Sequence, residues 1–195
     1  GSVESDGEGT ILTTSSCLLA PHRNEGKSRA ELEEYLLKVF HAKRILWLDY
    51  GTLEGDDTDG HIDTLARFCP NDTIVYVQCT DPTDSHYKEL QAMECQLKEF
   101  RTLDGLPYRL MPLPMADAVY EEGQRLPATY ANFLILNGVV LYPTYNSPEK
   151  DMEAKRVLRE AFPYHILKGV DCRALIKYHG SLHCVTMQYP DGVLQ

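Results

Sequence analysis

The feature that most constrains the fold is a pattern of elements that recurs three times along the chain. Each copy reads as strand, turn, strand, helix and strand, and the copies begin near Val3, His61 and Thr129. A further opening strand is predicted over 181–188. Units of this kind cannot bury their apolar faces alone, so we expect them to pack around a common axis. A plain doubly wound sheet would instead alternate single strands and helices. We therefore predict one α/β domain over residues 1–195, a propeller-like repeat of three units plus the first strand of a fourth.

Local signals place the elements of the first unit. Strands are predicted over 3–5 and 10–14, around an Asp6-Gly7 turn. Ser28 and Glu31 have the Ser-x-x-Glu spacing of a capping box and predict the start of a helix. The apolar run over 45–48 predicts a buried strand. Helical spacing predicts that the inward face of the helix consists of Leu32, Tyr35, Leu36, Val39 and Phe40.

The second and third units are predicted in the same way. The second has strands over 61–68, 73–78 and 108–111, and the third has strands over 130–136, 139–142 and 164–167. Asn137-Gly138 is a strong hairpin turn, and Ser147-Pro148 predicts the start of the third helix. The predicted inward faces of these two helices are Leu90, Met93, Leu97 and Phe100, and then Ala154, Val157, Leu158, Ala161 and Phe162.

Composition narrows the class of partner. The 195 residues include 19 basic and 29 acidic side chains, a net charge of -10. Such a field repels phosphate backbones and attracts cations, so nucleic acid is excluded as the expected partner and a cationic small molecule is favoured. No stretch approaches the roughly 20 apolar residues that cross a bilayer, so no membrane partner is expected. Six cysteines without a Cys-x-x-Cys pair predict free thiols in a reducing, cytoplasmic setting and no structural zinc site.

The first candidate site is the histidine and carboxylate pair His61 and Asp63. On a strand, alternation would place both side chains on one face. The acidic run before them invites a calcium interpretation, but aligning Gly60 with the sixth loop position leaves Gly55 and Ala66 at the first and twelfth. Those positions require acidic ligands, so we reject calcium. The alternative is an acidic surface loop that leads into a strand.

The second candidate is Cys184, in the predicted opening strand of the last unit. If equivalent strands approach one axis, Cys184 could face His61 and Asp63 and form a Cys-His-Asp site. Thiolate attack requires a suitable thiol pKa and a histidine within hydrogen-bond reach. One alternative is that Cys184 is a small apolar residue that only fills space in the core. Another is that His183 is a structural histidine whose hydrogen bonds are made within the protein. The remaining histidines are predicted to be surface or loop residues: His22, His41, His86, His165 and His179.

Several segments, taken in order, resemble the agmatine deiminase and bacterial peptidyl-arginine deiminase family. Residues 1–10 resemble the segment that follows a glutamate in that family's Glu-Gly-Gly block. Three further segments are similar to its Gly-His-x-Asp, Tyr-x-Asn-Phe and Gly-x-x-His-Cys blocks: Gly60-His61-Ile62-Asp63, Tyr130-Ala131-Asn132-Phe133 and Gly180-Ser181-Leu182-His183-Cys184.

The resemblance implies a pentein fold, a closed propeller of five units with the site in its central channel. The chain would then be the C-terminal portion of a longer enzyme, and the missing N-terminal portion would be its partner. The family's Trp-x-Arg-Asp-x-Gly-Pro block is absent. Exposed edges left by the absent units could be covered by that portion or by another copy, so a homo-oligomer is a second option.

The resemblance also implies roles for the candidate residues. Cys184 would attack the guanidinium carbon and displace ammonia, which leaves a covalent thiouronium intermediate. His61 would protonate the ammonia and then activate water, and Asp63 would bind the guanidinium nitrogens. No metal or cofactor is implied. Agmatine, giving N-carbamoylputrescine, is the favoured substrate. Peptidyl-arginine giving citrulline, amidine transfer to an amine, and a non-catalytic interaction module are the alternatives.

Overall fold

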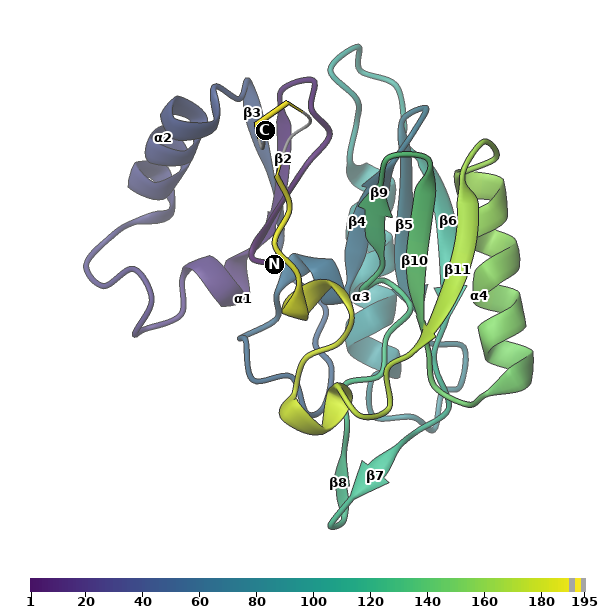
Figure 1. The fold of residues 1–195 in the computed structure, drawn as a ribbon. Coiled ribbons are helices and arrows are strands. Elements are labelled where there is room, and N and C mark those ends of the chain that lie inside the picture. The colour runs from purple at the N-terminus through teal and green to yellow at the C-terminus, as the bar shows by residue number, and fades with distance from the viewer. Residues whose placement is uncertain (190–191, 194–195) are drawn as a thin grey trace.

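The computed structural model describes residues 1–189 and 192–193, and it contains three mixed three-stranded sheets (Figure 1). In each sheet an antiparallel hairpin is followed by a helix and by a third strand parallel to the second. This order confirms the predicted repeat. The sheets are β1 (Val3–Ser5), β2 (Thr10–Thr14) and β3 (Arg44–Leu48); β4 (Ala66–Cys69), β5 (Thr73–Gln78) and β6 (Arg109–Pro114); and β9 (Leu134–Leu136), β10 (Val139–Thr144) and β11 (Ile166–Asp171). The crossover helices are α2 (Arg29–Phe40), α3 (Tyr87–Glu99) and α4 (Pro148–Ala161).

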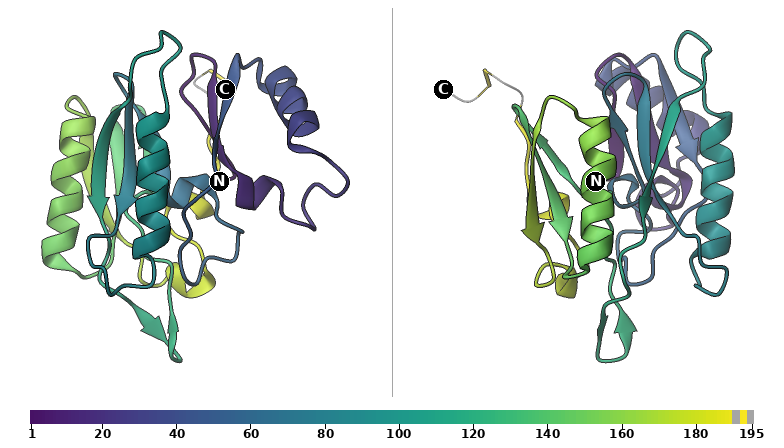
Figure 2. Two further views of the ribbon diagram at one scale, coloured as in Figure 1. Left: turned by 180° about the vertical axis from the view of Figure 1, so that it is seen from behind. Right: turned by 90° about the vertical axis from the view of Figure 1, so that its right-hand side faces the viewer.

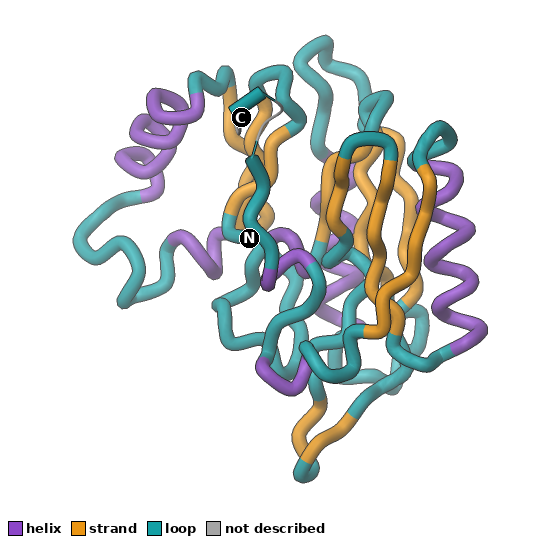
Figure 3. Tube along the Cα trace, viewed as in Figure 1, coloured by secondary structure: helices purple, strands orange, loops and turns teal. Residues whose placement is uncertain are grey.

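Short elements complete the chain. They are α1 (Ser15–Leu18), the small hairpin of β7 (Tyr120–Glu121) and β8 (Gln124–Arg125), and three 3-10 turns, η1 (Ile62–Thr64), η2 (Ile176–Tyr178) and η3 (His183–Val185). Figure 3 shows that loops and short helical turns occupy the region between and below the sheets. No helix in the described ranges combines the length and the apolar character that crossing a membrane requires. All six cysteines are free thiols.

The two larger apolar cores lie between neighbouring units. One joins residues of the first sheet, such as Leu12 and Leu48, to the second, and the other joins the second sheet to the third. Helix α3 contacts β3 as well as β5, and α4 contacts β6 as well as β11 (Figure 2, left). Each of these helices therefore covers its own sheet and the last strand of the preceding unit. Burying each large apolar side chain of this kind contributes about 1.5–3 kcal/mol. The predicted inward residues of α3 and α4 are confirmed, with Phe100 only partly buried.

Helix α2 departs from this arrangement. It begins at the predicted capping box, in which Ser28 and Glu31 bond to each other's backbone amides. Of its predicted inward face, however, only Leu32 is buried, while Tyr35, Val39 and Phe40 are 63%, 50% and 47% exposed. The inward face was therefore predicted wrongly. The reason is that α2 packs on the first sheet alone, over a small core that involves no other unit.

Two predicted opening strands are also wrong. Residues 62–64 form η1 instead of a strand, and β4 begins at Ala66. Residues 183–185 form η3, so the described residues contain no opening strand of a fourth unit. In the third unit the opening strand is shorter than predicted and starts at Leu134. At these places the backbone bonds to distant segments instead of a paired strand, because the amide of Asp63 donates to the carbonyl of Gly1 and the amide of His183 donates to the carbonyl of Asn132.

One buried arginine ties the three units together. Arg67 of β4 is 3% exposed, and its Nε lies 2.9 Å from a carboxylate oxygen of Glu4 in β1. Its Nη1 donates a hydrogen bond of 2.6 Å to the carbonyl of Phe133, and the guanidinium carbon lies 4.8 Å from the centre of the Phe133 ring. Because Arg67 contacts residues of the other two units, it links all three units to one another.

Candidate active site

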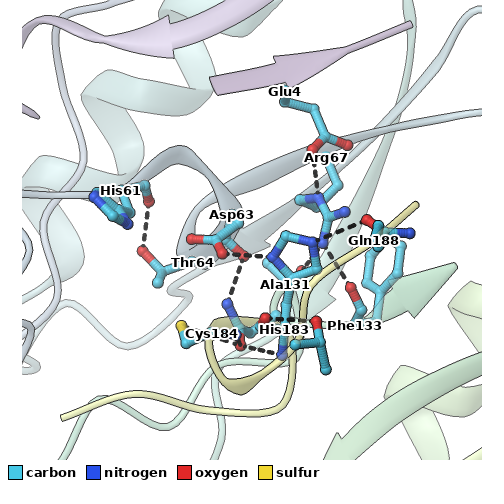
Figure 4. A network of polar contacts seen from close by, with 12 residues as sticks. Glu4, His61, Asp63, Thr64, Arg67, Ala131, Phe133, His183, Cys184 and Gln188 are labelled. Carbon is cyan, nitrogen blue, oxygen red and sulfur yellow. Dashed lines mark hydrogen bonds and ion pairs between the residues drawn. The ribbon is translucent and has the colours of Figure 1, made fainter. Parts of the chain in front are cut away.

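Three segments that are distant in the sequence meet beside this arginine. They are the turn η1 of the second unit, the segment before β9, and η3 near the end of the chain. Figure 4 shows the side chain of Asp63 beside that of His183, with Cys184 and Arg67 nearby and with His61 on the other side of Asp63. His61 and Asp63 reach the site from a 3-10 turn, not from one face of a strand as predicted. The turn that carries Cys184 contacts Asp63 through His183 and Asn132, and a catalytic site formed by Cys184, His61 and Asp63 stays a prediction.

Asp63 is a buried carboxylate with one oxygen free. It is 1% exposed, and its Oδ2 lies 2.7 Å from Nδ1 of His183. Its Oδ1 is also buried and has no hydrogen-bond partner among the described residues. Burial raises the pKa of Asp63, but the hydrogen bond and charge of His183, together with the charges of the amino terminus and of Arg67, outweigh it and hold that pKa below the ordinary value. An ionised buried oxygen of this kind needs a hydrogen-bond donor, which a water molecule or a ligand can supply.

His61 supplies a second unpartnered atom. Its Nε2 is buried and makes no hydrogen bond within the described part of the chain. Burial is the largest effect that lowers the pKa of His61, the positive charge of the amino terminus at Gly1 adds to it, and the charge of Asp63 only partly opposes the two. The imidazole is therefore neutral near pH 7 and able to accept a proton.

The loop before His61 is held by a local network. The carboxylate of Asp56 accepts hydrogen bonds from the hydroxyl of Thr58 at 2.6 Å and from the amide of Gly60 at 2.7 Å. The hydroxyl of Thr14, in the first unit, donates a hydrogen bond of 2.6 Å to the carbonyl of Gly60. Gly60 has φ +82°, and a Cβ there would lie 2.9 Å from the hydroxyl of Ser16, so glycine is required. This network presents His61 at the start of η1.

Cys184 lies at the centre of η3 as an exposed residue with a partly buried sulfur. Its Sγ lies 3.5 Å from Oδ1 of Asn132, and its backbone amide donates to the same oxygen at 3.3 Å. Burial and the negative charge of Asp63 raise the pKa of the Cys184 thiol. The thiol of Cys184 is therefore neutral near pH 7, and a cation bound at Asp63 would favour the thiolate.

Sequence reasoning assigned no role to two residues of the site. Asn132 is fully buried, accepts a 2.8 Å hydrogen bond from the amide of His183, and donates to the carbonyl of Asp63 at 3.3 Å. His183 is satisfied as predicted, but its partner is Asp63, which makes it part of the site. An amide side chain inside the aromatic segment 130–133 was the available signal for Asn132.

The backbone of Gly1 also belongs to the site. Its carbonyl accepts a 3.3 Å hydrogen bond from the amide of Asp63. A Cβ at position 1 would lie 2.6 Å from Nδ1 of His61, and 2.7 and 2.8 Å from the two oxygens of Asp63. Only glycine leaves both side chains in place.

Among the other histidines, which were predicted to be surface or loop residues, His86 lies in the loop before α3 but is buried. It is 4% exposed, its Nδ1 lies 2.7 Å from Asp84, and its Nε2 accepts a hydrogen bond from the amide of Glu54 at 2.8 Å. Arg125 pairs with the other oxygen of Asp84 at 2.8 Å. Asp84 lies two residues before His86 in the same loop, so the alternation of side chains along a strand does not predict this pair.

The repeated units define an α/β fold of the pentein type. An amidinotransferase from Microseira wollei superposes on 95% of the chain with a TM-score of 0.55 at 16% identity, a likeness of fold alone. The chain belongs to the Porphyromonas-type peptidyl-arginine deiminase family, whose model matches residues 1–190.

Individual relatives agree with this membership. A protein from Porphyromonas gingivalis, provisionally described as an arginine deiminase, is 59% identical with a TM-score of 0.95 over 98% of this chain and 56% of its own. The agmatine deiminase of C. jejuni with substrate bound is 42% identical with a TM-score of 0.87 over 94% of this chain and 53% of its own. The agmatine deiminase of Pseudomonas fluorescens is 34% identical over 97% of this chain and 56% of its own length. The chain thus spans about half the length of the curated relatives it matches.

Proposed function

We propose that this chain carries the nucleophile, the acid-base histidine and a guanidinium-binding carboxylate of a deiminase that hydrolyses agmatine to N-carbamoylputrescine and ammonia. One observation carries the proposal. A buried carboxylate oxygen of Asp63 and a buried nitrogen of His61, neither with a partner among the described residues, lie together with the thiol of Cys184. A planar cation with several N–H donors satisfies the carboxylate and presents an electrophilic carbon.

The mechanism follows from the protonation states. The guanidinium donates hydrogen bonds to Oδ1 of Asp63, and its positive charge lowers the pKa of the thiol that Asp63 had raised. Neutral His61 takes the proton of the thiol, and the sulfur of Cys184 bonds to the guanidinium carbon. His61 then returns the proton to the departing nitrogen, so that ammonia leaves and a thiouronium ester remains. Next, His61 takes a proton from water as the oxygen bonds to the carbon. The carbon–sulfur bond then breaks, the sulfur leaves as thiolate and regains a proton from His61, and the ureido product forms with release of its hydroxyl proton to solvent.

The choice of substrate rests on the relatives. Curated relatives and the substrate-bound C. jejuni structure are agmatine deiminases, which favours free agmatine. The family takes its name from peptidyl-arginine deiminase. Arginine within a peptide, which would be converted to citrulline, is therefore the second candidate substrate. The two substrates share the guanidinium and differ at the other end of the molecule.

The rest of a longer polypeptide is the partner that we propose for this chain. Helices α3 and α4 each pack on the last strand of the preceding unit, whereas α2 exposes Tyr35, Val39 and Phe40. By the same internal symmetry, the last strand of an additional unit would cover this face of α2. A cytoplasmic location is proposed from the six free thiols.

Ammonia release by the full-length protein tests the function. We expect turnover of agmatine and a loss of at least about 1,000-fold in Cys184→Ala, because a covalent step loses its nucleophile. Cys95→Ala, which removes an exposed cysteine of α3, is the matched control and keeps the wild-type rate. An unaltered rate in Cys184→Ala contradicts the nucleophile assignment. Turnover of a blocked arginine peptide alone selects the second substrate, and turnover of neither favours a non-catalytic interaction module.

A further inference from the structure

His183 connects the nucleophile to the carboxylate of the site. It directly precedes Cys184 in η3, and its Nδ1 lies 2.7 Å from Oδ2 of Asp63 (Figure 4). Because an ionised carboxylate only accepts hydrogen bonds, Nδ1 carries the proton and donates it. A hydrogen bond to a charged acceptor is short and strong, so it orients the acceptor.

The second oxygen of Asp63 shows why this orientation matters. Oδ1 is buried without a partner among the described residues, whereas Oδ2 is held by His183. Without the hydrogen bond from His183, the carboxylate of Asp63 could rotate about χ2, because this side-chain torsion of aspartate has a broad distribution of allowed angles. Rotation would move the free oxygen away from its ligand and exchange the two oxygens.

The ring of His183 is itself fixed from several sides. Its backbone amide donates a hydrogen bond of 2.8 Å to Oδ1 of Asn132. Its backbone carbonyl accepts a hydrogen bond of 2.8 Å from the hydroxyl of Thr186. Its Nε2 lies 3.4 Å from the amide oxygen of Gln188, whose nitrogen donates 2.8 Å to the carbonyl of Ile135. The side chain is 17% exposed. The donor at Nδ1 is therefore held in place before any ligand arrives.

We propose that His183 is a positioning residue, which fixes the carboxylate of Asp63 so that Oδ1 faces the guanidinium. Since His183 and Cys184 share one turn, this contact also sets the position of the sulfur relative to the bound cation. The inference rests on the proposed deiminase function and adds to it a residue that acts through Asp63 rather than on the substrate.

Steady-state kinetics of the full-length protein with agmatine test the role, using three variants. His183→Leu removes the donor, and we expect KM to rise by about 10- to 100-fold, with a smaller fall in kcat. His183→Asn places an amide nitrogen near the position of Nδ1, and we expect KM within about threefold of wild type because the donor to Asp63 is kept. His165→Leu is the matched control, because the ring of His165 packs edge-on against Phe162 in the third unit.

The outcomes separate the hypotheses. If wild-type protein releases no ammonia, the proposed function fails. If wild-type protein is active and His183→Leu has an unchanged KM, the positioning role is wrong. It is also wrong if His183→Asn and His183→Leu both keep a wild-type Tm and share the same raised KM, because the donor that His183→Asn retains would then make no difference to binding.

Discussion

The amide oxygen of Asn132 lies 3.5 Å from the sulfur of Cys184, although the two residues are 52 positions apart in the chain. The same oxygen accepts the backbone amides of His183 at 2.8 Å and of Cys184 at 3.3 Å. A single side chain from the third unit thus anchors the turn that carries the nucleophile.

Replacing Asn132 is expected to impair both activity and stability. In Asn132→Ala the turn loses its anchor, and kcat/KM falls by about 100-fold, since a displacement of about 1 Å at a reacting group can cost that much. Buried donors left without an acceptor also lower the free energy of unfolding by about 1–3 kcal/mol. Kinetics and denaturant unfolding of the full-length protein measure the two effects. Asn137→Ala, in the exposed hairpin turn, is the control, and a wild-type kcat/KM in Asn132→Ala would refute the anchoring role.

Alkylation of Cys184 by iodoacetamide is expected to be slow at neutral pH in the absence of ligand. Burial and Asp63 raise the pKa of this thiol, so the neutral form persists up to a higher pH than in an ordinary cysteine, for which the value is about 8.5. The alkylation rate should therefore rise only as the pH passes above the ordinary range, as thiolate forms. Mass spectrometry of the peptide that contains Cys184 measures the rate.

A paired variant identifies the electrostatic cause of this slow alkylation. Asp63→Asn removes the nearby negative charge and should move the midpoint of the alkylation profile to lower pH. Exposed Cys95 serves as the internal reference in the same digest. A profile for wild-type Cys184 that levels off below the ordinary thiol range would contradict the assignment.

The buried pair of Arg67 and Glu4 is expected to contribute to stability through the contact between units. Arg67→Met leaves the carboxylate of Glu4, which is 10% exposed, without its partner, and should lower the free energy of unfolding by about 3–5 kcal/mol. The double variant with Glu4→Gln should lose less than the sum of the single changes. Arg109→Met, which breaks an ion pair that is 52% exposed on both sides, should cost at most about 1 kcal/mol. Equal costs for Arg67→Met and Arg109→Met in urea unfolding would argue against the inter-unit role.

Acid should weaken the fold through Asp84. Burial raises the pKa of this carboxylate, but hydrogen bonds from His86 and Arg125 outweigh it and lower the value to about 2. Because the folded pKa lies below the unfolded value of about 3.9, the stabilisation is present above pH 4 and is lost as the pH falls toward 2. Asp84→Asn should remove about 2 kcal/mol at neutral pH and flatten the acid limb of the stability curve.

Unfolding curves between pH 2 and 7 measure this effect. Asp104→Asn, in an exposed loop, is the control and should change stability by less than about 0.5 kcal/mol. An acid limb that is as steep in Asp84→Asn as in wild type would show that other carboxylates carry the pH dependence.

The success and failure of the sequence predictions have a common physical basis. The capping box at Ser28 and Glu31, the Asn137-Gly138 turn and the apolar periodicity of α3 and α4 are local signals, and each produced the predicted element. The exposed face of α2 was predicted as buried because periodicity shows which residues are apolar and not whether a neighbouring unit covers them.

By itself, the sequence determined the three repeated units and the residues His61, Asp63 and Cys184 as candidates, because turns, caps and side-chain chemistry are encoded by near neighbours. Tertiary structure alone decided that η1 and η3 replace strands at the site, that Asn132 and His183 hold it, and that Arg67 joins the units. These features depend on hydrogen bonds between residues about 50 to 120 positions apart. Such bonds form only once the packed sheets bring distant backbones and side chains together, because no short-range pattern specifies which buried donor meets which acceptor.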